Sequence, residues 1–384
     1  MKIVFKTFIV SILFINVWSC NANSKSKSDI TSHHEVKTET TEQFIKVALL
    51  LDTSNSMDGL IDQAKAQLWE IVNELSYAKC DNDRPSLKIA LYEYGNDGLN
   101  AEKGYIRKVI DFSSDLDDIS KELFSLTTNG GNEFCGHVIQ TSLDQLKWGN
   151  NPDDLKLIFI AGNEPFTQGE VSYKTATTNA NEKDVTVNTI FCGDYQEGIV
   201  SYWKEGANLT RGNYMAINHN QATANIPSPY DDDILILNQQ LNKTYIYYGS
   251  NGSSKMALQE EQDSKAQGYS KANAVSRTVS KSSHLYKNSS WDLVDAVEIE
   301  SLDLDKIKND ELPKELRDKS KEEIIAFLKT KKEERTSINK KIQELNKKRK
   351  AFISTSQSKN DNGLESAMIK AIKTQAKKKN YKWE

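Results

Sequence analysis

Hydrophobic residues occur in two alternating patterns from Phe44 onward. Residues 44–51 form a near-continuous apolar run, which is typical of a strand that is buried on both faces of a parallel sheet. Between Met57 and Leu75, apolar residues recur every three or four positions, as they do along one face of a helix. The pattern predicts a central strand followed by a long helix that packs back against the sheet.

Both patterns repeat as far as about Gly249, and we call residues 44–249 the head. Further strands are predicted at 87–94, 105–112, 155–160, 185–192 and 214–217, and further helices at 116–126, 133–148, 173–183, 196–209 and 231–248. Two strands follow the first helix in succession, and after them helices and strands alternate regularly. This order predicts an α/β fold with a doubly wound, mostly parallel sheet that has one antiparallel edge.

The pattern changes after Gly249. Residues 250–290 are rich in Ser, Lys, Gln and Asn, which predicts a polar linker with room for one polar helix. A compact apolar cluster around Trp291 is interpreted as an element that docks on the head. Between Lys321 and Phe352, apolar and long side chains alternate four and three residues apart, which predicts a helix with a heptad seam. Residues 291–384 are therefore predicted to be a helical, basic C-terminal region.

Charged side chains interrupt this heptad seam. Lys331, Arg335 and Arg349 occupy seam positions and would weaken a coil formed by two copies of the chain. The sequence leaves open a helical hairpin, docking against the head, and dimerisation. A second amphipathic helix is predicted from Leu364 to Ile372. Because the seam is so poorly apolar, a chain that ends near Gly249 is expected to fold without the C-terminal region.

The first 43 residues have the pattern of an exported protein with a lipid anchor. Lys2 and Lys6 precede an apolar run that is too short to span a membrane but suits a signal peptide over residues 1–19. The run ends in Val17-Trp18-Ser19-Cys20, which resembles the lipobox of bacterial lipoproteins and implies that Cys20 is acylated. The alternative is an ordinary secretory signal. Residues 20–43 are mostly polar and are interpreted as a flexible tether.

Charge and composition narrow the classes of partner. The chain has 50 Lys and Arg against 54 Asp and Glu, but residues 301–384 hold 23 basic and 14 acidic side chains. The first 300 residues are therefore acidic, which disfavours nucleic-acid binding by the head. Four cysteines and five histidines are too few for a dense disulfide scaffold or a zinc cluster.

The loop after the first strand is the leading candidate for a functional site, because ligands of doubly wound sheets bind beyond the carboxyl ends of the strands. This loop reads Asp52-Thr53-Ser54-Asn55-Ser56-Met57. One carboxylate and two hydroxyls on a tight turn can face a single hard divalent cation. The alternative interpretation is that these side chains only cap the helix that follows.

This Asp-x-Ser-x-Ser motif, between a buried strand and a long helix, resembles the metal-ion-dependent adhesion site of von Willebrand factor A domains. The resemblance implies a bound Mg²⁺ or Ca²⁺ and an open coordination position for a carboxylate from a protein partner. It also implies two further ligand loops. In the second, Asn132 stands where the family has threonine, with Thr128 and Glu133 nearby. In the third, Gly162 stands where the family has aspartate, and Glu164 follows.

The predicted metal ligands are therefore Asp52, Ser54, Ser56, Thr128, Asn132, Glu133 and Glu164. A shell with three carboxylates, from Asp52, Glu133 and Glu164, would shift the preference of the site toward calcium. Because two ligand positions depart from the family pattern, a site that binds no metal is the alternative.

The remaining cysteines and histidines give no sign of catalysis. Cys135 and Cys192 are predicted at the same rim of the sheet, where a disulfide between them is one expectation for an oxidising compartment. No histidine adjoins either cysteine in the sequence. His137 and His219 accompany neither a nucleophile elbow nor an acid–base pair. The chain is therefore predicted not to be an enzyme.

The whole chain resembles bacterial von Willebrand A-domain lipoproteins. The implied function is a protein-binding module in the cell envelope, anchored to a membrane by lipid and facing the periplasm or the exterior. Two alternatives stay open: a metal-independent envelope scaffold that acts through its helical arm, and an exported hydrolase. The lysine runs at 346–350 and 377–379 are interpreted as a solvated helix face, with anionic lipid or cell-wall polymer as the alternative contact.

Overall fold

The computed structural model describes residues 42–80, 84–220, 226–297, 304–356 and 363–383. The predicted signal peptide, Cys20 and the tether up to residue 41 lie outside these ranges. None of the helices in the described ranges is both long and apolar enough to cross a membrane.

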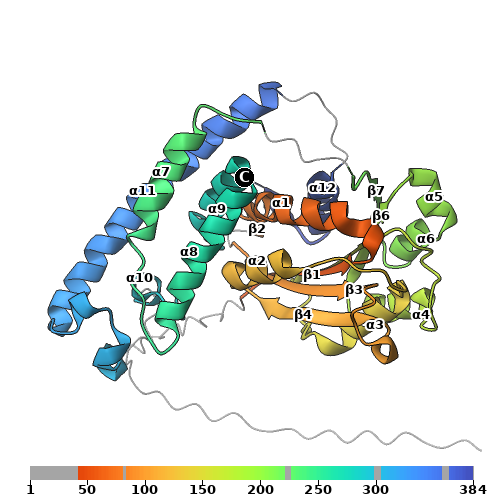
Figure 1. Ribbon diagram of the computed structural model, residues 1–384, viewed down its shortest axis with the longest axis horizontal. Helices are drawn as coiled ribbons and strands as arrows, with labels where there is room; N and C mark the ends of the chain where they lie inside the picture. The colour runs from red at the N-terminus through yellow and green to blue at the C-terminus, as the bar shows by residue number, and fades with distance from the viewer. Residues whose placement is uncertain (1–41, 81–83, 221–225, 298–303, 357–362, 384) are drawn as a thin grey trace, which may run out of the picture. The chain divides into compact units, whose positions relative to one another are not determined.

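A six-stranded sheet forms the centre of the head, in the order β4-β3-β1-β5-β6-β7 (Figure 1). Its strands are β1 (Phe44–Asp52), β3 (Ser86–Tyr94), β4 (Ile106–Ser113), β5 (Leu155–Gly162), β6 (Thr186–Cys192) and β7 (Tyr214–Ile217). The central strand β1 pairs in parallel with β3 and β5, and β4 alone pairs antiparallel, with β3. The predicted mostly parallel sheet with one antiparallel edge is confirmed.

Helices cover both faces of this sheet. Those within the head are α1 (Asp58–Leu75), α2 (Leu116–Ser125), α3 (Cys135–Gln145), α4 (Tyr173–Glu182), α5 (Tyr195–Val200), α6 (Trp203–Asn208) and α7 (Asp231–Asn242). Along β1, Val47 and Leu49 face the cluster under α1, whereas Ala48 and Leu50 face the cluster under α3 and α4. This alternation explains why β1 is apolar throughout.

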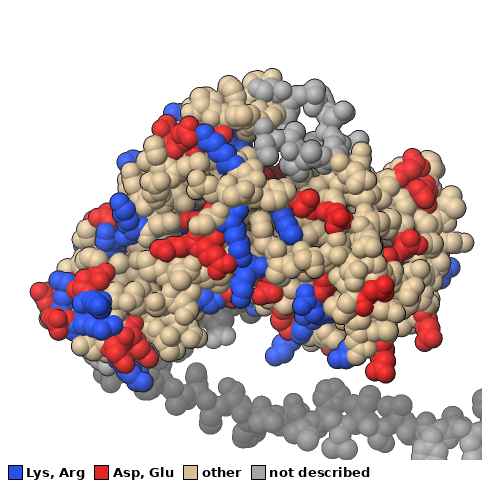
Figure 2. All heavy atoms as spheres, in the orientation of Figure 1, with Lys and Arg blue, Asp and Glu red and all other residues tan. Residues whose placement is uncertain are grey.

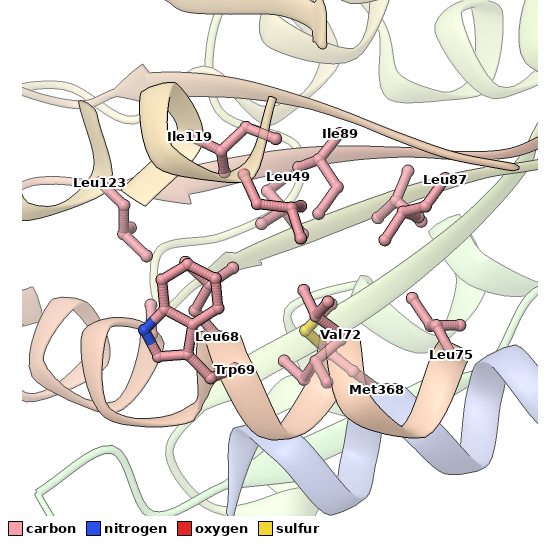
Figure 3. Packing of buried hydrophobic residues seen from close by; sticks show 14 of the residues in the cluster. Leu49, Leu68, Trp69, Val72, Leu75, Leu87, Ile89, Ile119, Leu123 and Met368 are labelled. Atoms are coloured by element: carbon pink, nitrogen blue, oxygen red, sulfur yellow. The ribbon is translucent and has the colours of Figure 1, made fainter. Parts of the chain in front are cut away.

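The helix α1 is packed on two sides. Figure 3 shows Leu68, Val72 and Leu75 between α1 and the strands, near Leu49 and other strand residues. Met368, which belongs to a helix near the C-terminus, lies beside Val72 in the same view. The helix that carries the candidate motif at its start is therefore held by the sheet and by the C-terminal region together.

The C-terminal region is largely helical, as predicted. Residues 291–384, which the sequence predicts to be helical, contain α10 (Leu293–Ala296), α11 (Lys321–Ser356) and α12 (Leu364–Lys377). The predicted linker contains α8 (Gly252–Tyr269) and α9 (Lys271–Lys281), so the name C-terminal region now covers residues 250–384. The 3-10 helices of the described chain are η1 (Asn55–Met57), η2 (Ala101–Lys103), η3 (Leu304–Lys306), η4 (Asn309–Glu311) and η5 (Lys314–Leu316). The short strands β2 (Ala78–Cys80) and β8 (Tyr381–Trp383) pair antiparallel, and three-residue strands carry too little pattern for prediction.

Residues 250–290 differ from the polar linker that their composition predicts. They contain α8 and α9, and residues 273–281 of α9 are all buried. Their buried charges are paired: Arg277 lies 2.8 Å from Asp117 and 2.6 Å from Asp263, and Lys281 lies 2.8 Å from Asp263. Polar residues are expected to be exposed unless oppositely charged partners pair with them in the core, as Asp117 and Asp263 do here.

The heptad seam faces the rest of the same chain. The Arg335 guanidinium lies 2.6 Å from both Asp292 and Asp295, and Arg349 lies 3.1 Å from Asp231 of α7. Of the three arrangements left open by the sequence, the structure has docking, and α11 runs beside α7 (Figure 1). On the face drawn in Figure 2, basic side chains are interspersed with acidic ones.

Two predicted helices differ from the observed ones: the first is divided and the second ends early. The helix predicted at 196–209 is divided into α5 and α6, because Tyr202 between them adopts a left-handed backbone conformation with φ of 71°. The helix predicted at 231–248 ends at Asn242. The aromatic residues that follow enter the core, where Tyr245 contacts Trp291 with 5.9 Å between ring centroids. The predicted docking of the Trp291 cluster is thus confirmed.

Candidate metal centre

The Asp-x-Ser-x-Ser motif lies where β1 ends and α1 begins. Asp52 is fully buried, and its Oδ1 accepts a hydrogen bond from the Ser54 backbone N–H at 2.8 Å. The hydroxyl oxygens of Ser54 and Ser56 lie 3.2 Å apart. Ser54 precedes η1, but its side chain makes no capping hydrogen bond. The Ser54 side chain therefore does not cap the helix, and the Asp52 carboxylate closes the turn before it.

Three buried acceptor oxygens at this rim have no hydrogen-bond partner among the described residues. They are Oδ2 of Asp52, Oε2 of Glu133 and Oδ1 of Asn163. Leaving one buried acceptor unpaired costs roughly 1–3 kcal/mol, so three in one place need a compensating group. A cation supplies that compensation, since it needs oxygen acceptors and offers no competing acceptor of its own.

The backbone brings these oxygens together from three loops. A Cβ atom built on Gly95, after β3, would lie 2.6 Å from Cγ of Glu133 and 2.9 Å from Oδ1 of Asp52. The side chains of Asp52 and Glu133 therefore border the same glycine. Asn163 follows β5, and its Nδ2 donates to the Ser56 hydroxyl at 3.3 Å. The site thus gathers the ends of β1, β3 and β5 and the start of α3.

Burial dominates the electrostatics of Asp52. It raises the pKa of the carboxyl from 3.8 to about 7, against the opposing effect of hydrogen bonds from Ser54, and the charge of Glu164 raises it slightly further. A divalent cation at this position would favour the ionised carboxylate. The residues present therefore fit a cation both by their unpaired oxygens and by their charge.

The other predicted ligands of the second and third loops are less buried than Asp52 and Glu133. Asn132 is exposed, and the Thr128 hydroxyl donates a hydrogen bond to the Asp58 carboxylate. Glu164 is half-buried, and its backbone carbonyl accepts a hydrogen bond from the Trp203 indole at 2.8 Å. Within the described ranges, no three His, Cys, Asp or Glu side chains come close enough to hold a metal ion by themselves. The predicted shell with three carboxylates is therefore not formed, and the argument for calcium is lost.

A family model for the von Willebrand factor type A domain matches residues 46–199. Residues 46–199 are a von Willebrand factor type A domain. Domains of this type are commonly protein-interaction modules rather than enzymes. A search of curated proteins finds no match.

Several solved structures resemble the von Willebrand A domain of this chain. The conserved hypothetical protein BatB from Bacteroides thetaiotaomicron is 16% identical, with a TM-score of 0.35, and the match covers 45% of this chain and 90% of BatB. The SpRpn10 VWA domain is 16% identical with a TM-score of 0.34, over 45% and 87% of the two chains. Proximal thread matrix protein 1 from the mussel byssus, with a zinc-occupied MIDAS motif, is 16% identical with a TM-score of 0.35. That match covers 46% of this chain and 44% of the mussel protein.

The disulfide expected between Cys135 and Cys192 is wrong. Both are buried free thiols of the von Willebrand A domain. Cys135 belongs to the apolar cluster under α3 and Cys192 to the cluster under α1, so the sheet separates them. Burial raises the pKa of both thiols, which makes them poor nucleophiles as well.

Sequence reasoning missed Asn163 and Tyr94. The positional rule that points to Glu164, a polar residue just beyond a strand end, applies equally to Asn163. Tyr94 is the register partner of Asp52 in the β1–β3 pair, and its buried hydroxyl donates to the Ala161 carbonyl at 3.0 Å. The register of two strands cannot be deduced from either strand alone, which is why Tyr94 carried no signal.

Asp52 should make the metal-free von Willebrand A domain less stable at neutral pH than at acidic pH. Its carboxyl binds a proton more tightly in the folded chain, where the pKa is about 7, than in the unfolded chain. The tighter binding of this proton should therefore add its full amount to the free energy of unfolding below about pH 4. This stabilisation should decrease as the pH rises toward 7 and be absent above that. Asp52→Asn should remove this component, which urea unfolding at a series of pH values measures. Identical pH profiles for both proteins would contradict the prediction.

Proposed function

We propose that this protein binds a protein partner through a divalent cation at the rim of its von Willebrand A domain. The observation that carries the proposal is a group of three buried acceptor oxygens, on Asp52, Glu133 and Asn163, that have no partner in the described part of the chain. The hydroxyls of Ser54 and Ser56 lie beside them and complete a set of oxygen donors.

The number of oxygen donors in this set is too small to fill the coordination shell of the cation, which leaves a position that a partner can occupy. Mg²⁺ and Ca²⁺ take roughly six to eight oxygen ligands. Five side chains, if each gives one oxygen, leave at least one position for another molecule. When bound, the cation supplies positive charge at the rim, and a carboxylate of the partner is the protein ligand that suits it best. Asp52 and Glu133 would balance the two charges of the ion, and the hydroxyls of Ser54 and Ser56 would add neutral oxygen ligands.

The role as an interaction module agrees with the family. A catalytic role has no comparable support, because the buried thiols have raised pKa values. Nucleic acid is not among the proposed partners, since the first 300 residues are acidic. Mg²⁺ and Ca²⁺ are both proposed, as the donor set contains only oxygen.

The experiment that tests this proposal is photo-crosslinking of the full chain in its native cells. A photoreactive residue at the exposed position 132 should capture a partner when Mg²⁺ or Ca²⁺ is present. Chelation and Asp52→Ala should each abolish the cross-link, whereas Asn55→Ala, an exposed neighbour in the same turn, should retain it. A cross-link that persists with chelator and in Asp52→Ala would exclude metal-assisted binding and favour a metal-independent scaffold.

We further propose that the protein is anchored in a bacterial cell envelope by lipid on Cys20, facing the periplasm or the exterior. The support for this is the lipobox-like sequence before Cys20 and the polar tether after it. Two acyl chains give stable membrane binding, whereas one is marginal.

Cys20→Ser should therefore move the protein from the membrane fraction to a soluble fraction. Immunoblotting of fractionated cells measures the distribution, and Ser24→Thr in the tether serves as the control. Unchanged membrane retention of Cys20→Ser would contradict the lipid anchor.

A further inference from the structure

We infer that Asn163 supplies a neutral amide oxygen to the cation, and that the Tyr94 phenol keeps the adjacent position 162 free of any side chain. This inference rests on the proposed metal site and specifies its ligands. It assigns the third loop of the site to an amide, and it leaves the cation with two carboxylates only.

The two ends of the Asn163 amide have different surroundings. Its nitrogen donates to the Ser56 hydroxyl at 3.3 Å, which ties the loop after β5 to the Asp-x-Ser-x-Ser turn. Its oxygen is buried and has no hydrogen-bond partner among the described residues. An amide oxygen is a common ligand of hard divalent cations. Asn163 is therefore tied to a predicted ligand through its amide nitrogen, and its amide oxygen is a buried acceptor that needs a positive partner.

Tyr94 explains why the neighbouring position contributes nothing. A Cβ atom on Gly162 would lie 2.6 Å from the Tyr94 hydroxyl and 3.0 Å from Oδ2 of Asp52. Contacts below 3.0 Å essentially never occur for real Cβ atoms, so a side chain at position 162 would force the phenol to shift. The phenol is fully buried, and its hydroxyl donates a hydrogen bond to the Ala161 carbonyl. Oδ2 of Asp52 has no hydrogen-bond donor among the described residues.

The second carboxylate of the site then comes from Glu133. Its side chain is 5% exposed, and its Oε2 is unpaired among the described residues. Together Asp52 and Glu133 carry two negative charges, which match a divalent ion. A third carboxylate in place of Asn163 would add Coulombic attraction in a site that is poorly solvated.

Isothermal titration of the full chain with Mg²⁺, Ca²⁺ and Mn²⁺ tests this assignment. Asn163→Leu should weaken binding roughly tenfold or more, which corresponds to about 1.4 kcal/mol or above. Asn163→Asp should strengthen binding of all three ions. Asn132→Leu, which changes an exposed side chain in the second loop, should leave the affinity unchanged.

The outcomes separate this inference from the proposed function. If the wild-type chain binds none of the three ions, the metal site itself is wrong. If the wild-type chain binds and Asn163→Leu binds equally well, only the assignment of Asn163 is overturned. Should Asn163→Leu fail to fold, Asn163→Asp decides, because an unchanged or weaker affinity in that near-isosteric variant also overturns the assignment.

The part played by Tyr94 is tested by stability rather than by metal binding. Gly162→Ala should lower the melting temperature, because its methyl group would meet the phenol oxygen. Tyr94→Phe removes that oxygen. Gly162→Ala should therefore lower the melting temperature less in the Tyr94→Phe background than it does in the wild-type background. Equal effects of Gly162→Ala in both backgrounds would show that the phenol does not control position 162.

Discussion

A chain that ends at Gly249 should fail to fold, although it contains the whole von Willebrand A domain. The reason is that the C-terminal region covers the outer side of α1. Trp69 and Val72 of α1 are fully buried, and they share one apolar cluster with Val275 of α9 and Met368 of α12. Fully burying one such side chain is worth about 1.5–3 kcal/mol. A domain with a total stability of about 5–15 kcal/mol cannot lose several of these contacts.

Polar contacts connect the same elements. The Asn73 amide donates to the Ser276 carbonyl at 3.0 Å. Gln63 and Gln67 of α1 accept hydrogen bonds from the first backbone N–H groups of α12, at 3.2 and 2.6 Å. Removing the C-terminal region would expose both the apolar surface and these polar partners.

Circular dichroism and gel filtration of residues 42–249 and of residues 42–384 measure the effect. The longer chain should melt cooperatively as a monodisperse species, and the shorter one should aggregate or lack a transition. This expectation reverses the one drawn from the heptad seam alone. Cooperative melting of residues 42–249 near the temperature of the longer chain would show that the head is independent of the C-terminal region.

Asp263→Ala should destabilise the protein by about 3–5 kcal/mol, because it leaves two buried cations without their shared partner. Asp263 lies 2.6 Å from Arg277 and 2.8 Å from Lys281, whose side chains are 1% and 0% exposed. Although burial alone would raise the pKa of Asp263, the charges of Lys281 and Arg277 hold it well below its usual range. The ionised carboxylate is thus part of the folded core.

Urea unfolding at neutral pH measures this loss. Glu261→Ala is the matched control, because Glu261 lies on the same helix and forms an exposed pair with Lys265 that should contribute little. A free energy of unfolding for Asp263→Ala within about 1 kcal/mol of wild type would indicate that Asp117 alone compensates Arg277 and Lys281.

Much of the fold follows from local pattern. The continuous apolar run of β1 and the helical spacing of α1 are strong signals, because both elements are buried on more than one side. The C-terminal region was harder to predict, since α9 buries Arg277 and Lys281 instead of apolar residues. The partners of Arg277, Asp117 and Asp263, lie 160 and 14 positions before it, and Asp263 lies 18 positions before Lys281. Composition cannot reveal such pairing.

The candidate site also has a part that the sequence predicts and a part that it does not. Asp52, Ser54 and Ser56 belong to one continuous turn, so their proximity follows from the sequence. Asn163 and Tyr94 reach the site through the register of β5 and β3 with β1, which no single segment encodes. The family position favoured Asn132, but the chain after the glycine pair leaves that side chain exposed and buries Glu133 instead.

Thermal unfolding of the full chain with EDTA, Mg²⁺ or Ca²⁺ tests the central claim most directly. An ion that binds only the folded state should raise stability by about 2.7 kcal/mol at one hundred times its dissociation constant. The account predicts a higher melting temperature with at least one ion for wild type and for Asn55→Ala, and no change for Asp52→Ala. A wild-type melting curve that is the same in EDTA and at millimolar concentrations of both ions would contradict metal binding at this rim.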